Sequence, residues 1–185
     1  MTRYKLLASA AGLALAASIT GTGSAHASSG LGTRTLENYM GGTCLSGGSG
    51  DGDQVVVSTS CTLSTNQGAI WTFSGAAGGY NTLKDGYNKC LDARDDSTHN
   101  PDQLGDPVQV WSCNGGNQQE WNVQVEFDSS DGTQYIRLIN KASGRGYVLD
   151  ARNDGNHFPT TSGDPVQLYQ YNGTSNQQWG VLTAA

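Results

Sequence analysis

The sequence predicts an all-β protein in which three repeats of about 50 residues close around one hydrophobic core. The composition, with 26 glycines and eight tyrosines beside short β-branched runs, is typical of short strands joined by turns. Turn-forming pairs recur, namely Asn114-Gly115, Asp131-Gly132 and Asn172-Gly173. The chain also repeats itself internally, and repetition at this period indicates a fold built from copies of one unit.

The last two repeats are copies of each other without a gap. Residues 91–121 align with residues 149–179 at a constant offset of 58 positions. Both segments read Leu-Asp-Ala-Arg, then Gly-Asp-Pro-Val-Gln with an aromatic residue two positions on, then Asn-Gly and Gln-x-Trp. The pattern predicts four short strands per repeat. In the last repeat we expect them near residues 135–140, 147–149, 166–171 and 179–182.

The first repeat is a decayed copy. A Thr-Cys-Leu-Ser run matches the Lys-Cys-Leu-Asp run of the second repeat, but the polar residues that follow are not kept. The residues expected at the places of the aspartate, the first glutamine, the aromatic residue and the last glutamine are Ser46, Val57, Thr59 and Ala69. We therefore expect this repeat to be purely structural.

One tryptophan recurs at the same place in each repeat: Trp71, Trp121 and Trp179. Large aromatic side chains at equivalent places favour a shared core. Three units are too few to cap a solenoid, and each is too short to fold alone. The sequence therefore predicts that the three units pack together as one domain.

The repeated pattern Cys-Leu-Asp, Val-Gln-x-Trp-x-Cys and Gln-Gln-x-Trp resembles the ricin-type β-trefoil lectins and the related carbohydrate-binding modules of bacterial glycosidases. The resemblance covers roughly residues 33–183. It implies a β-trefoil with repeats near 33–78, 79–128 and 129–185. The residues alone leave three disulfide pairings open for four cysteines. The resemblance implies the local pairs Cys44–Cys61 and Cys90–Cys113.

A sugar offers a face of C–H groups and a rim of hydroxyls, so its site needs an aromatic platform and fixed hydrogen-bonding groups. Asp92 and Asp150 are the candidate acceptors, and Trp111 and Tyr169, each 19 residues later, are the candidate platforms. The resemblance adds the supporting amides. These are Gln109, Gln118 and Gln119 in the second repeat and Gln167, Asn176 and Gln177 in the third. Gln118 stands where the family usually has asparagine.

The loop between the aspartate and the aromatic residue is longer than usual for the family. It carries His99 with Pro101 in the second repeat and His157 with Pro159 in the third. A loop that joins the carboxylate to the platform passes beside the pocket. We therefore expect the two histidines to form a pocket wall and to make binding weaken as the pH falls through about 6.5.

The N-terminus predicts export. Arg3 and Lys5 precede an apolar run over residues 6–17, and Ala25-His26-Ala27 is a small-x-small cleavage site. We expect a signal peptide over residues 1–27 and a secreted domain over residues 28–185. The apolar run is shorter than the ~20 residues of a membrane-spanning helix, so no membrane insertion is expected.

The predicted mature chain carries eight basic and 16 acidic residues, a net charge of −8. This charge argues against nucleic acid or an anionic membrane as the partner. No cofactor is expected, and a zinc site is disfavoured because no cysteine has a ligand-spaced Cys or His beside it. The expected partner is a carbohydrate of galactose-type or xylan-like structure. The sequence does not determine the oligomeric state.

A glycosidase and a trefoil protease inhibitor are the two alternative functions. A glycosidase would need two carboxylates in a cleft, for which Asp92 with Asp95 or Asp150 with Asp154 would be the candidates. The chain is too short for a further cleft domain, and other catalytic motifs are absent from the sequence. We therefore expect no enzyme. A trefoil protease inhibitor is the remaining alternative, although an inhibitor loop would not require the same polar and aromatic set in two repeats.

Overall fold

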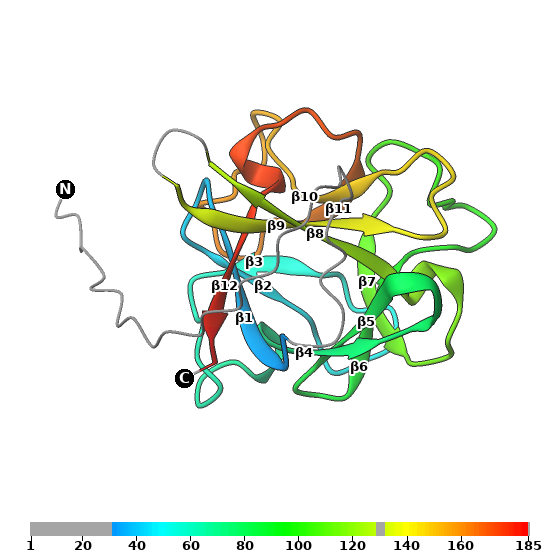
Figure 1. Cartoon of the computed structure of the whole chain (residues 1–185), viewed down its shortest axis with the longest axis horizontal. Helices are drawn as coiled ribbons and strands as arrows, with labels where there is room; N and C mark the ends of the chain where they lie inside the picture. The colour runs from blue at the N-terminus through cyan, green and yellow to red at the C-terminus, as the bar shows by residue number, and fades with distance from the viewer. Residues whose placement is uncertain (1–30, 129–131, 185) are drawn as a thin grey trace, which may run out of the picture.

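The computed structural model describes residues 31–128 and 132–184, which form twelve β-strands and four short 3-10 helices (Figure 1). The strands are β1 Thr33–Asn38, β2 Cys44–Ser46, β3 Val56–Ser58, β4 Ile70–Gly75, β5 Tyr80–Asp85, β6 Lys89–Ala93, β7 Val108–Ser112, β8 Trp121–Phe127, β9 Gln134–Asn140, β10 Val148–Ala151, β11 Val166–Tyr169 and β12 Trp179–Thr183. The predicted signal peptide and Asp131 of the predicted Asp131-Gly132 turn lie outside the described residues.

Six of the strands close into a ring. In order around the ring they are β1, β4, β5, β8, β9 and β12, and each pairs antiparallel with the next. The last strand returns to the first over five residue pairs, from Arg34 with Thr183 to Asn38 with Trp179. A closed sheet leaves no edge within the ring for another chain to pair with.

The other six strands form three hairpins, β2 with β3, β6 with β7, and β10 with β11. Each stretch of four consecutive strands therefore supplies two strands to the ring and one hairpin, which is the arrangement of a β-trefoil. The fold expected from the sequence is confirmed. The four strands expected in the last repeat are present as β9 to β12, and each end lies within two residues of its expected position.

The three repeated tryptophans meet in one core. Trp71, Trp121 and Trp179 are fully buried, and they pack among leucines and valines from all three repeats. Each indole N–H donates to the backbone carbonyl of a leucine 26 or 30 residues earlier, at 3.0 to 3.2 Å. Because a buried Trp needs a partner for its N–H, these bonds set the distance between the last strand of each repeat and its hairpin.

Both predicted disulfides are present, Cys44–Cys61 and Cys90–Cys113. They tie β2 and β6 to the segments that follow the hairpins of the first and second repeats. In the chain-entropy model, loops of this size stabilise the fold by roughly 3 kcal/mol each.

The strand register corrects the expected alignment of the first repeat. Leu45 pairs with Val57 as Leu91 pairs with Val110, so Val56, not Val57, stands at the place of Gln109. Ser58, not Thr59, stands at the place of the aromatic residue. The reason is one additional residue between Ser58 and Cys61, compared with Trp111 and Cys113, which shifts any count made backward from Cys61.

Candidate functional site

The outer ends of the second and third hairpins each carry a buried aspartate. Asp92 on β6 is opposite Gln109 on β7, and Asp150 on β10 is opposite Gln167 on β11. The two aspartates are 3% and 2% exposed. Residues directly opposite each other in an antiparallel pair project to the same face, so each glutamine lies beside its carboxylate.

Amide groups hold the Asp92 carboxylate from two sides. Gln109 donates from Nε2 to Oδ1 at 2.9 Å, and Gln119 donates from Nε2 to Oδ2 at 2.9 Å. Gln119 is itself held, because its Oε1 accepts the backbone N–H of Asn114 at 2.8 Å. Burial raises the pKa of the Asp92 carboxyl, and the two amide bonds counter that shift.

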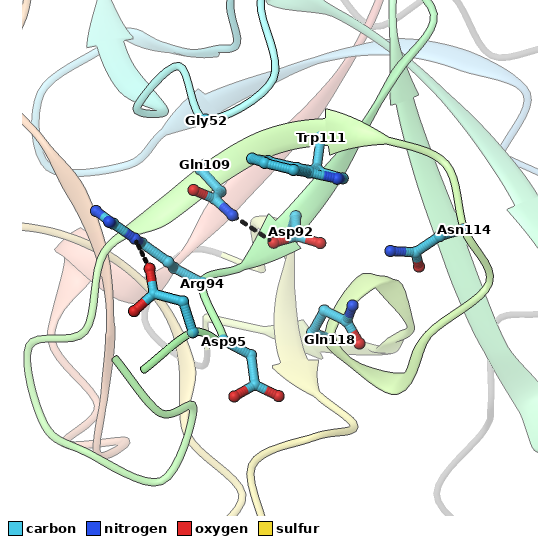
Figure 2. A pocket seen from close by; sticks show the side chains of 9 residues that line it. Gly52, Asp92, Arg94, Asp95, Gln109, Trp111, Asn114 and Gln118 are labelled. Atoms are coloured by element: carbon cyan, nitrogen blue, oxygen red, sulfur yellow. Dashed lines mark hydrogen bonds and ion pairs between the residues drawn. The ribbon is translucent and has the colours of Figure 1, made fainter. Parts of the chain in front are cut away.

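A cavity of about 450 Å³ opens above this carboxylate (Figure 2). Figure 2 shows the ring of Trp111 over Asp92, with Arg94 on one side of the carboxylate and Asn114 and Gln118 on the other. The Trp111 side chain is 40% exposed, unlike the three core tryptophans. The residues lining the cavity are Gly52, Asp92, Arg94, Asp95, Asp96, Gln109, Trp111, Asn114 and Gln118.

The Asp150 carboxylate is held by three amides. Gln167 donates to Oδ1 at 3.0 Å, while Gln177 and Asn176 both donate to Oδ2 at 2.9 Å. The second N–H of Asn176 donates to the carbonyl of Ala151 at 3.0 Å. Burial raises the pKa of Asp150 to about 6. The effect of burial is larger than the opposing effect of the three amide hydrogen bonds.

The cavity over Asp150 also measures about 450 Å³, and its aromatic wall is Tyr169, which is 36% exposed. Met40, from the turn between β1 and β2, forms part of its rim. The lining residues are Met40, Gly105, Asp150, Arg152, Asn153, Asp154, Gln167, Tyr169, Asn172, Thr174 and Asn176. Both hairpins therefore combine a fixed carboxylate acceptor, amide groups and an exposed aromatic face in one open depression.

Eight of the ten predicted sugar-contacting residues line these cavities. They are Asp92, Gln109, Trp111 and Gln118 at one and Asp150, Gln167, Tyr169 and Asn176 at the other. The remaining two, Gln119 and Gln177, are fully buried behind the carboxylates and hold them by hydrogen bonds.

The histidines do not form the pocket wall that the sequence led us to expect. Neither His99 nor His157 lines either cavity. Nδ1 of His157 lies 3.0 Å from Asp154 Oδ1, and that bond is the main cause that holds the pKa of Asp154 below its usual range. Asp154 in turn binds Nε of Arg152, which does line the cavity. His99 Nδ1 likewise lies 3.2 Å from Asp96 Oδ1. Asp96 and Asp154 line the two cavities, so each histidine lies behind a lining aspartate.

Several wall residues were missed by sequence reasoning. Arg94 and Arg152 follow the aspartates in the repeated Leu-Asp-Ala-Arg motif, and Asn114 and Asn172 begin the repeated Asn-Gly turns. Their recurrence at the 58-residue offset was a usable signal. Met40 carries no such signal, because it comes from the first repeat and packs beside the third.

Each cavity is also lined by a glycine from the preceding repeat, Gly52 at the Asp92 cavity and Gly105 at the Asp150 cavity. The N–H of Gly52 donates to the carbonyl of Val110 at 2.9 Å, and that of Gly105 donates to Leu168 at 2.8 Å. Both glycines have a positive φ, +88° and +83°, which disfavours any other residue at these places. Asp51 secures the first of these loops, because its carboxylate accepts the backbone N–H of Ser112, the neighbour of Trp111, at 2.7 Å.

The corresponding place in the first repeat has no carboxylate and no aromatic residue. Asn66 fills it, donating from Nδ2 to the hydroxyls of Ser46 at 3.0 Å and Ser58 at 3.3 Å and to the carbonyl of Ser60 at 3.0 Å. These polar groups satisfy one another, so the first hairpin presents no equivalent acceptor.

Two further properties concern the described residues as a group. Within residues 31–128 and 132–184, no helix is long and apolar enough to cross a membrane. In the same part of the chain, no cluster of three or more His, Cys, Asp or Glu side chains is arranged to hold a metal ion.

Comparison with known proteins gives one family and a set of related folds. A family model described as ricin-type beta-trefoil lectin domain-like matches residues 68–169. The designed threefold-symmetric protein ThreeFoil is 27% identical, with a TM-score of 0.66 over 82% of this chain and 98% of that chain. No curated protein matches the sequence.

Two natural proteins share the fold at lower identity. The Macrolepiota procera ricin B-like lectin in complex with lactose is 19% identical, with a TM-score of 0.60 over 83% of this chain and 96% of that chain. The exo-beta-1,3-galactanase 1,3Gal43A from Clostridium thermocellum is 23% identical, with a TM-score of 0.65. The match covers 82% of this chain but only 30% of the galactanase.

Proposed function

Since the chain belongs to the ricin-type beta-trefoil lectin domain-like family, we propose that it is a secreted carbohydrate-binding protein with two shallow sugar sites, one in the second repeat and one in the third. The carbohydrate partner follows from the family. The two sites and their residues are the finer part of the proposal.

One observation carries it: the same acceptor and platform occur twice. A carboxylate that already accepts amide N–H groups is fixed in direction, and its free lone pairs can accept sugar hydroxyls by charge-assisted hydrogen bonds. Trp111 and Tyr169 offer flat apolar faces for the C–H side of a sugar ring. A residue that served only the core would not remain 36 to 40% exposed.

The proposed ligands are galactose-type sugars or xylan-like chains. The lactose bound to the Macrolepiota lectin and the galactan substrate named for the Clostridium enzyme favour the galactose type. The match covers only 30% of that enzyme's chain, so it gives no reason to expect catalysis by this protein.

We propose that the protein is not an enzyme. Asp92 and Asp150 accept hydrogen bonds from amide N–H groups, an arrangement suited to a fixed acceptor. A glycosidase acid must instead donate a proton to the glycosidic oxygen. Release of reducing ends from galactan or xylan by the purified protein would contradict this part. Inhibition of trypsin, subtilisin or papain would favour the protease-inhibitor alternative.

Export is proposed from the predicted signal peptide over residues 1–27, with the mature domain over residues 28–185. Two disulfides suit an oxidising compartment. Mass spectrometry of protein recovered from the culture medium should show an N-terminus at Ser28. Retention of the first 27 residues would contradict the predicted cleavage.

The main experiment measures sugar binding by residues 28–185. Calorimetry with lactose and with xylobiose should detect binding of at least one sugar, and the double variant Asp92→Ala/Asp150→Ala should bind neither. Ser46→Ala changes the equivalent place of the first repeat and is the matched control, so it should bind like the wild type. Circular dichroism checks that each variant is folded. A folded double variant that binds as the wild type does would refute the site assignment.

A further inference from the structure

The aspartate and glutamine of each hairpin belong to a row that extends onto a third segment. Gln54 forms an antiparallel bridge with Gln109, so the row in the second repeat is Asp92, Gln109 and Gln54. Directly opposed residues project to the same face, which places the Gln54 side chain on the face that carries the sugar site.

The other two rows end differently. Pro107 forms the corresponding bridge with Gln167, so the third repeat has Asp150, Gln167 and Pro107. The first repeat ends its row on Pro165, opposite Val56. Proline has no side-chain donor or acceptor. Among the three rows, the one in the second repeat ends on a hydrogen-bonding side chain.

A smaller cavity, of about 300 Å³, lies at the Gln54 end of this row. It shares Gly52, Arg94 and Gln109 with the cavity above Asp92, so the two cavities adjoin. Its lining residues are Gly52, Gln54, Arg94, Pro107, Val108 and Gln109.

The side chains that line this smaller cavity suit another sugar unit. The Gln54 amide both donates and accepts, and the Arg94 guanidinium donates. Arg94 donates from Nε to Asp96 Oδ2 at 2.7 Å, and it lines both this cavity and the one above Asp92. The Pro107 ring offers apolar C–H surface. Asp95 and Asp96 line the adjoining cavity, so the local charge favours a neutral sugar over an acidic one.

We propose that the site of the second repeat binds two consecutive neutral sugar units of a chain, one over Asp92 and the next between Arg94 and Gln54, whereas the site of the third repeat binds one. This inference rests on the proposed function, since it assigns a ligand size to the same sites. The first repeat, which lacks a site of its own, then contributes to recognition through the loop that carries Gly52 and Gln54.

The test compares one sugar with two at each site separately. Asp150→Ala leaves only the site of the second repeat, and Asp92→Ala leaves only that of the third. Galactose against lactose, and xylose against xylobiose, are titrated into both variants by calorimetry or by NMR. The disaccharide should bind about tenfold more tightly than its monosaccharide at the second-repeat site, as expected for a few added hydrogen bonds. At the third-repeat site the two should agree within about twofold.

Gln54→Ala in the Asp150→Ala background sharpens the test. It should reduce disaccharide affinity to the level of the monosaccharide and leave monosaccharide affinity unchanged. Gln103→Ala is the control for loss of a glutamine side chain, because Gln103 is exposed in the second repeat and lines neither cavity. It should preserve the tenfold preference.

The outcomes separate this inference from the proposed function. Monosaccharide binding at both sites with equal disaccharide preference would overturn the second subsite and leave the proposed function standing. A preference that survives Gln54→Ala would also overturn it. If no sugar binds to the wild type or to either single variant, the proposed function and the inference both fail.

Discussion

The second and third repeats place their aspartates at equivalent positions, yet different sets of amide hydrogen bonds hold the two carboxylates. Asn176 donates to Asp150 and also to a backbone carbonyl, so both of its N–H groups are used and the Asp150 Oδ2 accepts two bonds. Gln118, at the equivalent place, lines the cavity, and Asp92 accepts one amide bond on each oxygen.

Gln118, where the family usually has asparagine, lies in the second-repeat cavity and not against the carboxylate. A single added methylene leaves the amide of the second repeat facing the cavity and leaves Asp92 with a free acceptor position on both oxygens. In the third repeat, the shorter asparagine saturates one oxygen of the carboxylate. Two copies with nearly the same residues therefore offer a sugar different acceptor positions.

The largest effect expected from having two sites concerns polymers. Each site alone should bind a monosaccharide with a Kd of about 0.1 to 1 mM, whereas two sites on one rigid body should raise the affinity for a polysaccharide by about a hundredfold. Asp92→Ala or Asp150→Ala should each remove this gain while keeping monosaccharide binding at the other site. Equal wild-type affinity for monomer and polymer, measured by calorimetry, would show that the sites act separately.

Beneath the two hairpins the repeats differ again, at the end of the strand that precedes each one. Asn140 donates from Nδ2 to the carbonyl of Gln118 at 2.9 Å. Asp85 holds the equivalent place in the second repeat, with 4% exposure, and its Oδ2 is buried without a partner in the described part of the chain. Burial raises the pKa of Asp85 to about 6.

Asp85→Asn should therefore stabilise the protein by about 2 kcal/mol at pH 7, since an amide would replace a buried charge. The sign depends on pH. The folded pKa of about 6 exceeds the ordinary value of 3.8 for an aspartate, so the wild type loses stability as the pH rises through this interval. The gain of the variant should be largest above pH 6 and vanish below pH 4. Chemical denaturation from pH 4 to 7 measures it, and a gain independent of pH would contradict this account.

Binding at the third-repeat site should weaken in acid. Asp150 has a pKa of about 6, and sugar hydroxyls require its charged form, so in the Asp92→Ala background affinity at pH 5 should be about tenfold lower than at pH 7. The variant His99→Ala/His157→Ala separates this cause from the histidines, because both rings lie behind the walls. It should follow the same curve as the wild type. Loss of the acid dependence in that variant would assign it to the histidines.

The smallest effect tests the amide difference itself. Gln118→Asn in the Asp150→Ala background should let the amide donate to Asp92, as Asn176 does to Asp150, and use an acceptor position that a sugar hydroxyl would take. We expect monosaccharide affinity at the second-repeat site to fall about threefold, less than the value of one full hydrogen bond. An increase would mean that fixing the carboxylate matters more than keeping its acceptor free.

The sequence repeats predicted many of the residues that line the cavities and the core. The 58-residue offset identified Asp92 with Asp150 and Trp111 with Tyr169, and all four line the cavities. The buried tryptophans were predicted correctly for the same reason, and the β-trefoil was predicted correctly from the resemblance to ricin-type lectins. Residues that recur at matched places in a repeat occupy equivalent environments, so sequence copies predict structural copies.

Contacts between repeats were decided only by the tertiary structure. Gly52 walls the second-repeat cavity and Met40 the third-repeat cavity, although both belong to the first repeat. The register that puts Val56 opposite Pro165 also needed the strands in place. Periodicity reports which residues are equivalent within the units. How the units pack around their common axis depends on a closed sheet and a shared core, which bring together residues more than 50 positions apart.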